Sequence, residues 1–134
     1  MNRLIAIFWG LVLISISGFS QCNLKIEISG IKNNTGKIML QLLGPDQKVI
    51  AQIMGEIKDE KCDISINNLN PGKYAIRYFH DENLNGIMET NIVGKPTEGY
   101  GFSNNAKGMF GAPPFEKWLF EIKNDIKITL KPTY

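Results

Sequence analysis

An alternation of apolar and polar residues with a period of two runs through most of the chain and limits what it is able to fold into. Successive side chains of a β-strand point to opposite faces, so this pattern predicts strands with one buried face. The apolar members of the runs are Leu24, Ile26 and Ile28; Ile38, Leu40 and Leu42; Val49, Ala51 and Ile53; Cys62, Ile64 and Ile66; Tyr74, Ile76 and Tyr78; Trp118, Phe120 and Ile122; and Ile126, Ile128 and Leu130. No stretch after residue 21 shows a convincing period of 3.6 residues, so we expect an all-β protein.

Turn-forming residues separate these runs. The segments between them are rich in Asn, Gly, Pro and Asp, as in residues 33–36, 44–46, 70–72 and 123–125. About seven short strands in a chain of this length are typical of a single β-sandwich of immunoglobulin-like type. A small closed barrel of the same strands is the alternative. We see no internal repeat and no domain boundary.

The N-terminus has the three parts of a secretory signal peptide. Arg3 is positively charged, residues 4–16 are almost wholly apolar, and small residues follow at positions 18 and 20. Gly18 and Ser20 occupy the −3 and −1 positions of a cleavage site, which predicts a signal peptide over residues 1–20.

Two alternatives to a cleaved signal peptide stay open. A membrane anchor needs about 20 apolar residues, and this run is shorter. A lipoprotein would be acylated at Cys22, although Gln21 stands where a small residue is needed. With cleavage before Gln21, the β-sandwich domain is residues 21–134, which contain no further apolar run long enough to span a membrane. We expect it to be exported, to a periplasmic, outer-surface or extracellular location.

Export bears on the two cysteines, Cys22 and Cys62. An even pair of cysteines is able to form a disulfide in an oxidising compartment. Closing a loop of about 40 residues would stabilise the fold by roughly 4 kcal/mol in the chain-entropy model. We expect Cys22 and Cys62 to pair, and two unrelated thiols are the alternative.

The charge of the chain excludes one class of partner. It has 15 Lys and Arg residues against 13 Asp and Glu residues, and Arg77 is the only arginine after the expected signal peptide. Proteins that bind nucleic acid carry a dense basic patch, so we expect no nucleic-acid partner. One histidine and two cysteines are also too few for a zinc site of four Cys or His ligands.

Residues 80–114 interrupt the alternation, and we expect them to form a long ordered loop. Irregular segments of more than about 15 residues are uncommon in compact domains and are usually functional or disordered. This one is not of low complexity, which favours an ordered and functional loop.

The first part of the loop has the ligand spacing of a calcium-binding loop. Oxygen-bearing side chains stand at loop positions 1, 3, 5 and 9, glycine stands at position 6, and a backbone carbonyl is available at position 7. The predicted calcium ligands are the side chains of Asp81, Asn83, Asn85 and Glu89 and the carbonyl of Ile87. Because only two of them are charged, we expect weak affinity. The alternative is an Asx-rich turn that binds no metal.

The second part of the loop is rich in glycine and carries three aromatic residues, Tyr100, Phe102 and Phe110. Glycines let the backbone pass closely, and the aromatic side chains between them form a candidate ligand surface. The alternative is that these rings turn inward and cap the end of the sandwich core.

Three segments in and beside the loop carry a specific resemblance. They are residues 79–86 (FHDENLNG), 94–105 (GKPTEGYGFSNN) and 110–115 (FGAPPF). They closely resemble an uncharacterised bacterial family, domain of unknown function 2141 (DUF2141). The resemblance covers nearly all of residues 21–134. It implies a secreted β-sandwich domain with no established activity.

Two further points qualify this resemblance. The family usually has Asp where this chain has Glu89, which keeps a carboxylate but lengthens its reach. More loosely, residues 69–74 (LNPGKY) resemble the turn into a strand of transthyretin-like sandwiches. Those domains are mostly accessory or adhesive modules, which favours a protein that is not an enzyme.

Two pairs of residues are candidate catalytic groups, but we predict no catalytic site. His80 beside Asp81, or Glu89 with Glu98, would supply general acid–base chemistry. However, neighbouring strand residues point to opposite faces, and sequence spacing does not bring the two glutamates together. The chain has no nucleophile elbow, phosphate loop or zinc motif.

The sequence therefore predicts a secreted, non-catalytic β-sandwich module that is stabilised by Ca²⁺ and presents the Gly/aromatic loop for binding. Two alternatives stay open. One is a structural or accessory component of the bacterial cell envelope. The other is a carbohydrate-binding module that stacks sugars on Tyr100, Phe102 and Phe110. The partner would be an unknown envelope protein or a glycan.

Overall fold

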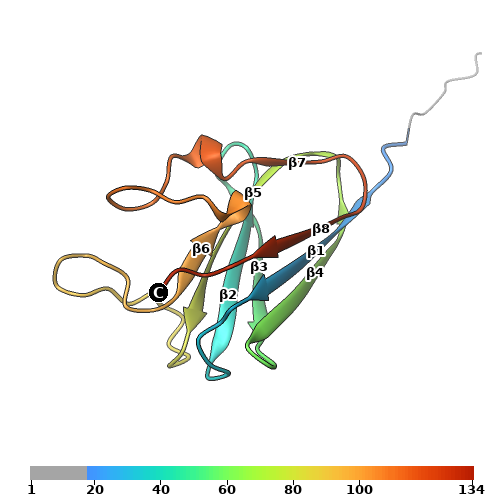
Figure 1. Cartoon of the computed structure of the whole chain (residues 1–134). Coiled ribbons are helices and arrows are strands. Elements are labelled where there is room, and N and C mark those ends of the chain that lie inside the picture. Colours follow the sequence, from blue (N-terminus) through green and yellow to red (C-terminus); the bar gives the residue numbers. More distant parts are fainter. Residues whose placement is uncertain (1–17) are drawn as a thin grey trace, which may run out of the picture.

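Eight strands and two short 3₁₀ helices follow one another along residues 18–134, the part of the chain that the computed structural model describes (Figure 1). The elements are β1 (Cys22–Ser29), β2 (Lys37–Leu43), β3 (Val49–Glu56), β4 (Lys61–Leu69), β5 (Gly72–Asp81), β6 (Tyr100–Phe102), η1 (Ser103–Asn105), η2 (Phe115–Lys117), β7 (Phe120–Ile122) and β8 (Ile126–Leu130). Most of the predicted signal peptide, residues 1–20, lies outside the described residues. Across residues 18–134, no helix has the length and apolarity that crossing a membrane requires.

The strands form two sheets, which confirms the predicted all-β sandwich. The smaller sheet has the order β4-β1-β8, with β1 and β8 parallel. The larger, five-stranded sheet has the order β3-β2-β5-β6, and β7 also pairs with β5. Figure 1 shows β1 and β4 in one layer and β2 and β5 in the other. The two sheets remain separate, unlike the alternative of one closed barrel.

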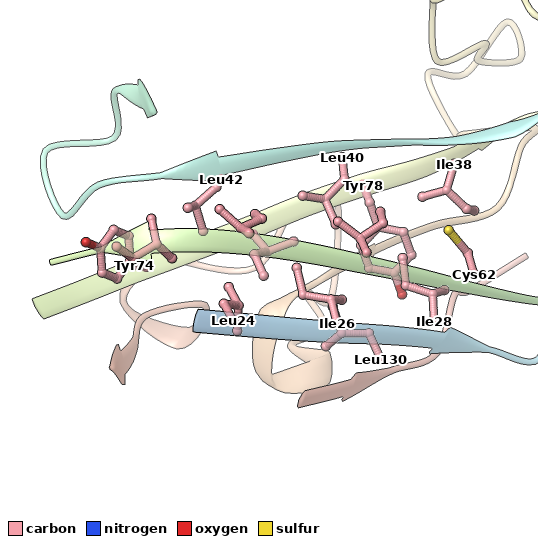
Figure 2. Packing of buried hydrophobic residues seen from close by; sticks show 14 of the residues in the cluster. Leu24, Ile26, Ile28, Ile38, Leu40, Leu42, Cys62, Tyr74, Tyr78 and Leu130 are labelled. Atoms are coloured by element: carbon pink, nitrogen blue, oxygen red, sulfur yellow. The ribbon is translucent and has the colours of Figure 1, made fainter. Parts of the chain in front are cut away.

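The core lies between the sheets and is built from the alternating residues that the sequence indicates. Figure 2 shows Leu24, Ile26 and Ile28 of β1 directed toward the side chains of β2 and β5. All three are almost completely buried. Burying an aliphatic side chain of this size contributes about 1.5–3 kcal/mol relative to leaving it exposed, so the period-two pattern itself fixes which face of each strand points inward.

The sequence predicts a strand that begins with Trp118, but in the structure Trp118 lies outside the strand. This residue caps the end of η2, and β7 begins only at Phe120. Trp118 packs with Leu43 and Ala75 on the outer face of the five-stranded sheet, where it forms a second apolar cluster. The alternation that includes Trp118 is therefore coincidental, because its side chain belongs to a different layer from that of Ile122.

The predicted loop over residues 80–114 is not wholly irregular, because it contains β6. This strand pairs with β5, placing Phe102 opposite Arg77 and Tyr100 opposite Phe79. Its length of only three residues explains why no alternation marks it in the sequence. Strand β5 also extends to Asp81, so the first residues of the predicted loop belong to the sheet.

Two glycines beside and within β6 let tyrosine rings pack against its inner face. A side chain on Gly101 would collide with the ring of Tyr78, and one on Gly99 would collide with the ring of Tyr134. Tyr78 belongs to the core between the sheets. Side chains alternate between the two faces of a strand. Since Gly99 and Gly101 face the tyrosine rings on the inner side, the Tyr100 side chain between them projects from the outer face of the sheet, beside its cross-strand neighbours.

A polar segment directly after β6 joins it to the neighbouring elements. Ser103 Oγ accepts a hydrogen bond from the Ile76 N–H of β5 (2.9 Å) and donates one to the Trp118 carbonyl (2.5 Å). Asn104 and Asn105 both have positive φ, which asparagine tolerates better than most residues. The Asn104 amide donates to two carbonyls around the end of η2. These residues of the GFSNN segment thus have a structural role.

The expected disulfide is not formed, because the fold separates the two cysteines. Cys22 and Cys62 are both free and buried. Cys62 lies opposite Ile28, six positions along β1 from Cys22, which corresponds to about 20 Å at the rise of a strand. A disulfide needs Cα atoms within about 7 Å. Burial raises the pKa of the Cys62 thiol to about 11, so this thiol is protonated and unreactive at neutral pH.

Replacing Gly101 with valine should destabilise the protein. The new side chain meets the Tyr78 ring, and overpacking of a core costs typically about 1–3 kcal/mol. We expect the melting temperature of residues 21–134 to fall by roughly 5–15 °C in a thermal denaturation experiment. Asn67→Val, at an exposed position of β4, is the control and should have little effect. An unchanged melting temperature in the Gly101 variant would show that β6 does not pack as described.

Candidate functional site

The turn that follows β5 is closed by a buried carboxylate. Asp81 is the last residue of β5 and is only 1% exposed. Its two oxygens accept hydrogen bonds from the backbone N–H groups of Asn85 (3.2 Å) and Gly86 (2.7 Å). No Lys, Arg or His nitrogen lies within 4.0 Å of this carboxylate in the described part of the chain. The negative charge of Asp81 is therefore balanced only by peptide dipoles.

A second buried carboxylate, Glu98, closes the same segment from its other end. Glu98 is 5% exposed and precedes β6. Its Oε1 accepts a hydrogen bond from the Glu82 N–H (3.2 Å), and its Oε2 accepts one from the Glu89 N–H (3.3 Å). Glu98 thus ties both ends of residues 82–89 to the approach of β6, a role that the sequence analysis did not identify. The sequence feature that could have indicated this role is the single carboxylate, Glu98, between small residues in residues 94–101 (GKPTEGYG).

The structure brings three of the predicted ligand side chains into contact, those of Asn83, Asn85 and Glu89, while the Asp81 carboxylate contacts the backbone N–H groups of the loop. The amides of Asn83 and Asn85 both donate to Glu89 Oε1, at 2.7 and 2.8 Å. The amide oxygens of the same two asparagines accept backbone N–H groups, that of Asn83 from Asn85 (3.2 Å) and that of Asn85 from Ile87 (2.9 Å). These are the hydrogen bonds of an Asx-rich turn. They place two carboxylates and two amides around one small loop.

A metal ion in this loop would depend on amide and carbonyl oxygens as well as carboxylates. Within residues 18–134, no three or more His, Cys, Asp and Glu side chains are grouped closely enough to hold a metal ion. Asp81 and Glu89 are the two carboxylates of the predicted ligand set. Such a mixed set of oxygens is of the kind that Ca²⁺ accepts, and it is poorly suited to metals that prefer nitrogen or sulfur.

His80 is a packed residue with both ring nitrogens occupied. It is fully buried, and its Nε2 lies 2.5 Å from the Thr35 carbonyl, which only accepts hydrogen bonds, so Nε2 carries the proton. Its Nδ1 then accepts the hydroxyl proton of Tyr134 at 2.8 Å, and the Tyr134 oxygen accepts the Lys32 N–H at 2.9 Å. The hydrogen bonds of His80 join β5 to the C-terminus, and none of them involves Asp81.

The outward face of the five-stranded sheet carries two rows of side chains that cross four strands. Residues directly opposite one another on neighbouring strands share a face, so the register defines each row. The first row is apolar and consists of Met54, Met39, Phe79 and Tyr100. The second row is mainly polar and consists of Gln52, Gln41, Arg77 and Phe102. The sheet thus presents an apolar stripe beside a polar one.

These rows form the floor of a hollow, which we call the outer groove. It has a volume of about 570 Å³, and Gly86 and Met88 of the loop after β5 contribute to its wall. A volume of this size is typical of sites for small organic ligands. In the groove, Arg77 is held by a hydrogen bond from its Nε to Gln41 Oε1 at 2.7 Å.

The three predicted ligand-surface aromatics separate in the structure. Tyr100 and Phe102 both line the outer groove. Phe102 also packs on Trp118, with ring centroids 4.3 Å apart, so it serves both the groove and the second apolar cluster. Phe110 is 98% exposed and does not line the groove. The sequence analysis did not identify the groove residues of β2 and β3, because only the strand register shows which outward-facing side chains are neighbours.

Glu98→Gln should loosen the loop without unfolding the sandwich. A glutamine is uncharged and has a single acceptor oxygen, so the Glu82 and Glu89 N–H groups both lose a charged partner and one of them loses its acceptor. Hydrogen bonds to charged groups contribute about 1.5–3 kcal/mol, which corresponds to at least roughly tenfold faster hydrogen exchange at these two amides. Hydrogen-exchange NMR measures this directly. The exposed Glu116→Gln variant is the control, and equal protection in both variants would contradict the role assigned to Glu98.

A comparison with known proteins covers nearly the whole sandwich. No curated protein and no solved structure matches the chain. One family matches residues 26–129, from the second half of β1 to the penultimate residue of β8, and it is described as an uncharacterized protein conserved in bacteria. This match confirms the resemblance that the sequence analysis found, including its extent over nearly all of residues 21–134. The chain therefore belongs to the bacterial family DUF2141.

Proposed function

We propose that this protein is a secreted, non-catalytic binding module whose loop after β5 is stabilised by Ca²⁺. The observation that supports this most is the convergence of Asn83 and Asn85 on Glu89 Oε1, beside a buried Asp81 that has no basic partner. Burying a carboxylate without a counter-charge is costly, and a cation in the loop offsets that cost. The N-terminal segment supports export.

The ligands would come from a short stretch of chain that is already closely folded. Asp81 and Glu89 supply the charged oxygens, rotation of the Asn83 and Asn85 amides supplies two neutral ones, and the Ile87 carbonyl supplies a fifth. With two carboxylates the affinity is low, with a Kd of about 10⁻⁴–10⁻³ M, as in extracellular modules. A Kd in that range suits a stabilising ion outside the cell.

The binding surface of the module is the outer groove. Tyr100 and Phe102 of the Gly/aromatic loop lie along it, and the loop after β5 contributes Met88. The absence of catalysis is supported by what the titratable residues of this region do. His80 is occupied by Thr35 and Tyr134, and the Glu98 carboxylate holds backbone N–H groups.

Titration of Ca²⁺ into chelator-treated residues 21–134 tests the metal part of this proposal. We expect a calorimetric isotherm with a Kd of 1 mM or lower and a raised melting temperature. At a tenfold excess over Kd the stabilisation is about 1.4 kcal/mol, which is several degrees for a domain of this size.

Two variants make the calcium experiment specific. Glu89→Gln changes an exposed ligand and should abolish both the heat of binding and the thermal shift. Asp63→Asn changes an exposed carboxylate on β4 and should leave both intact. Absence of heat and of a thermal shift in the unaltered protein would leave the loop an Asx-rich turn and remove calcium from the proposal.

A role as an accessory component of the cell envelope is the second candidate function. Two loops project from the same side of the molecule (Figure 1), and their tips carry strongly exposed apolar residues, Ile92 and Val93 on one and Met109 and Phe110 on the other. Exposed apolar residues grouped in this way are typical of interaction sites. An envelope protein that covers both tips would bury them.

Site-specific photo-crosslinking separates this second candidate from the first. A photoreactive phenylalanine at position 110 should give one defined adduct with an envelope protein in intact cells of the producing bacterium. The same group at the exposed position 67 of β4 should give none. Ile92→Asp should abolish the adduct, since it places a charge where an apolar contact is expected. Equal labelling from both positions would count against the envelope role.

A further inference from the structure

We propose that the outer groove binds a small organic anion with a carboxylate head and an apolar chain, the carboxylate on Arg77 and the chain along the row that contains Met39 and Phe79. This inference rests on the proposed binding function and adds the chemical class of the ligand. It follows from the charge of the groove, from the orientation of its arginine and from the arrangement of its two rows.

The groove has the charge of an anion receptor. Of the groove-lining residues in the described part of the chain, Arg77 is the one that is charged, and none is acidic. Among residues 18–134, Arg77 has no carboxylate within 4.0 Å. Arg77 is exposed at the groove and has no partner charge, so an anion from solution is able to reach it. A planar carboxylate matches the fork of its guanidinium in a way that an ammonium or hydroxyl group does not.

The guanidinium is already oriented by the protein. Gln41 lies directly opposite Arg77 on β2 and accepts its Nε–H at 2.7 Å. This bond uses one of the five N–H donors and leaves those on the two terminal nitrogens free to face the groove. A side chain held in place loses less conformational entropy when it binds, so Gln41 is a positioning residue for the anion.

The row next to Arg77 suits an apolar chain. Met54, Met39, Phe79 and Tyr100 follow one another across four strands, and three inter-strand spacings amount to about 14 Å. The two methionines are flexible and adapt to an aliphatic chain more readily than branched residues do. Because this row lies two residues along the strands from Arg77, one extended ligand reaches both.

The experiment is an NMR titration of residues 21–134 with three probes of equal chain length, octanoate, octylammonium and 1-octanol. We expect saturable amide shifts at Met39, Arg77 and Phe79 with octanoate, and at least tenfold weaker binding of the other two. Trp118 fluorescence gives a second signal, since its ring packs on Phe102 at the groove. A peptide ending in a leucine carboxylate, and the same peptide amidated, distinguish a peptide C-terminus from a fatty acid as the source of this chemistry.

Variants assign the binding to the two rows. Arg77→Gln should weaken octanoate at least tenfold and leave 1-octanol unchanged. Met39→Gln should weaken both. Lys25→Gln, which removes an exposed positive charge from β1 in the other sheet, is the matched control and should change neither.

Three results would overturn the inference. They are binding of octylammonium or 1-octanol that is as tight as that of octanoate, normal binding of octanoate by the Arg77→Gln variant, and the absence of amide shifts at the groove residues with every probe. Maltotriose is included as a carbohydrate probe. If it alone shifts Met39, Arg77 and Phe79, the ligand class is wrong while the proposed binding function stands. The calcium titration is carried out without these probes, so it tests the metal part of the proposed function separately.

Discussion

The packing of two tyrosine rings against β6 is the contact on which the candidate site depends. Tyr78 and Tyr134 occupy the space that side chains on Gly101 and Gly99 would need, and so hold a strand of three residues against β5. Once β6 is in place, Tyr100 has to face outward, and Glu98 reaches the backbone of the loop that follows β5. The inner surface of the sheet thereby determines what its outer surface presents.

Opposing electrostatic effects act on the loop between β5 and β6. Burying the carboxylates of Asp81 and Glu98 costs free energy, and the two backbone N–H groups that each of them accepts offset part of that cost. The hydrogen bonds to the two carboxylates hold the loop in place. The same two carboxylates also concentrate negative charge in it. This is the physical reason for proposing that a hard cation binds the loop with modest affinity, at a concentration of Ca²⁺ such as that outside the cell.

The sandwich could be predicted from the sequence because burial leaves a period of two in every long strand, as in Leu24, Ile26 and Ile28. The position of β6 could not, since three residues are too few to show a period. The disulfide prediction was wrong because neither the number of cysteines nor the expected export shows where along the strands Cys22 and Cys62 lie. The outer groove was missed for a related reason: Met39, Phe79 and Arg77 become neighbours only when the register of β2 against β5 is known.

The loop and the groove are parts of one unit. Gly86, whose N–H binds the Asp81 carboxylate, also lines the groove together with Met88. Whatever orders the loop therefore shapes one wall of the groove, and a ligand that packs against that wall favours the ordered loop. Binding at two sites that share a segment is reciprocal by thermodynamic necessity, because each ligand changes the affinity for the other by the same factor. An ion in the loop and an anion on Arg77 would be coupled through residues 86–88, and each would strengthen the binding of the other because both favour the same ordered loop.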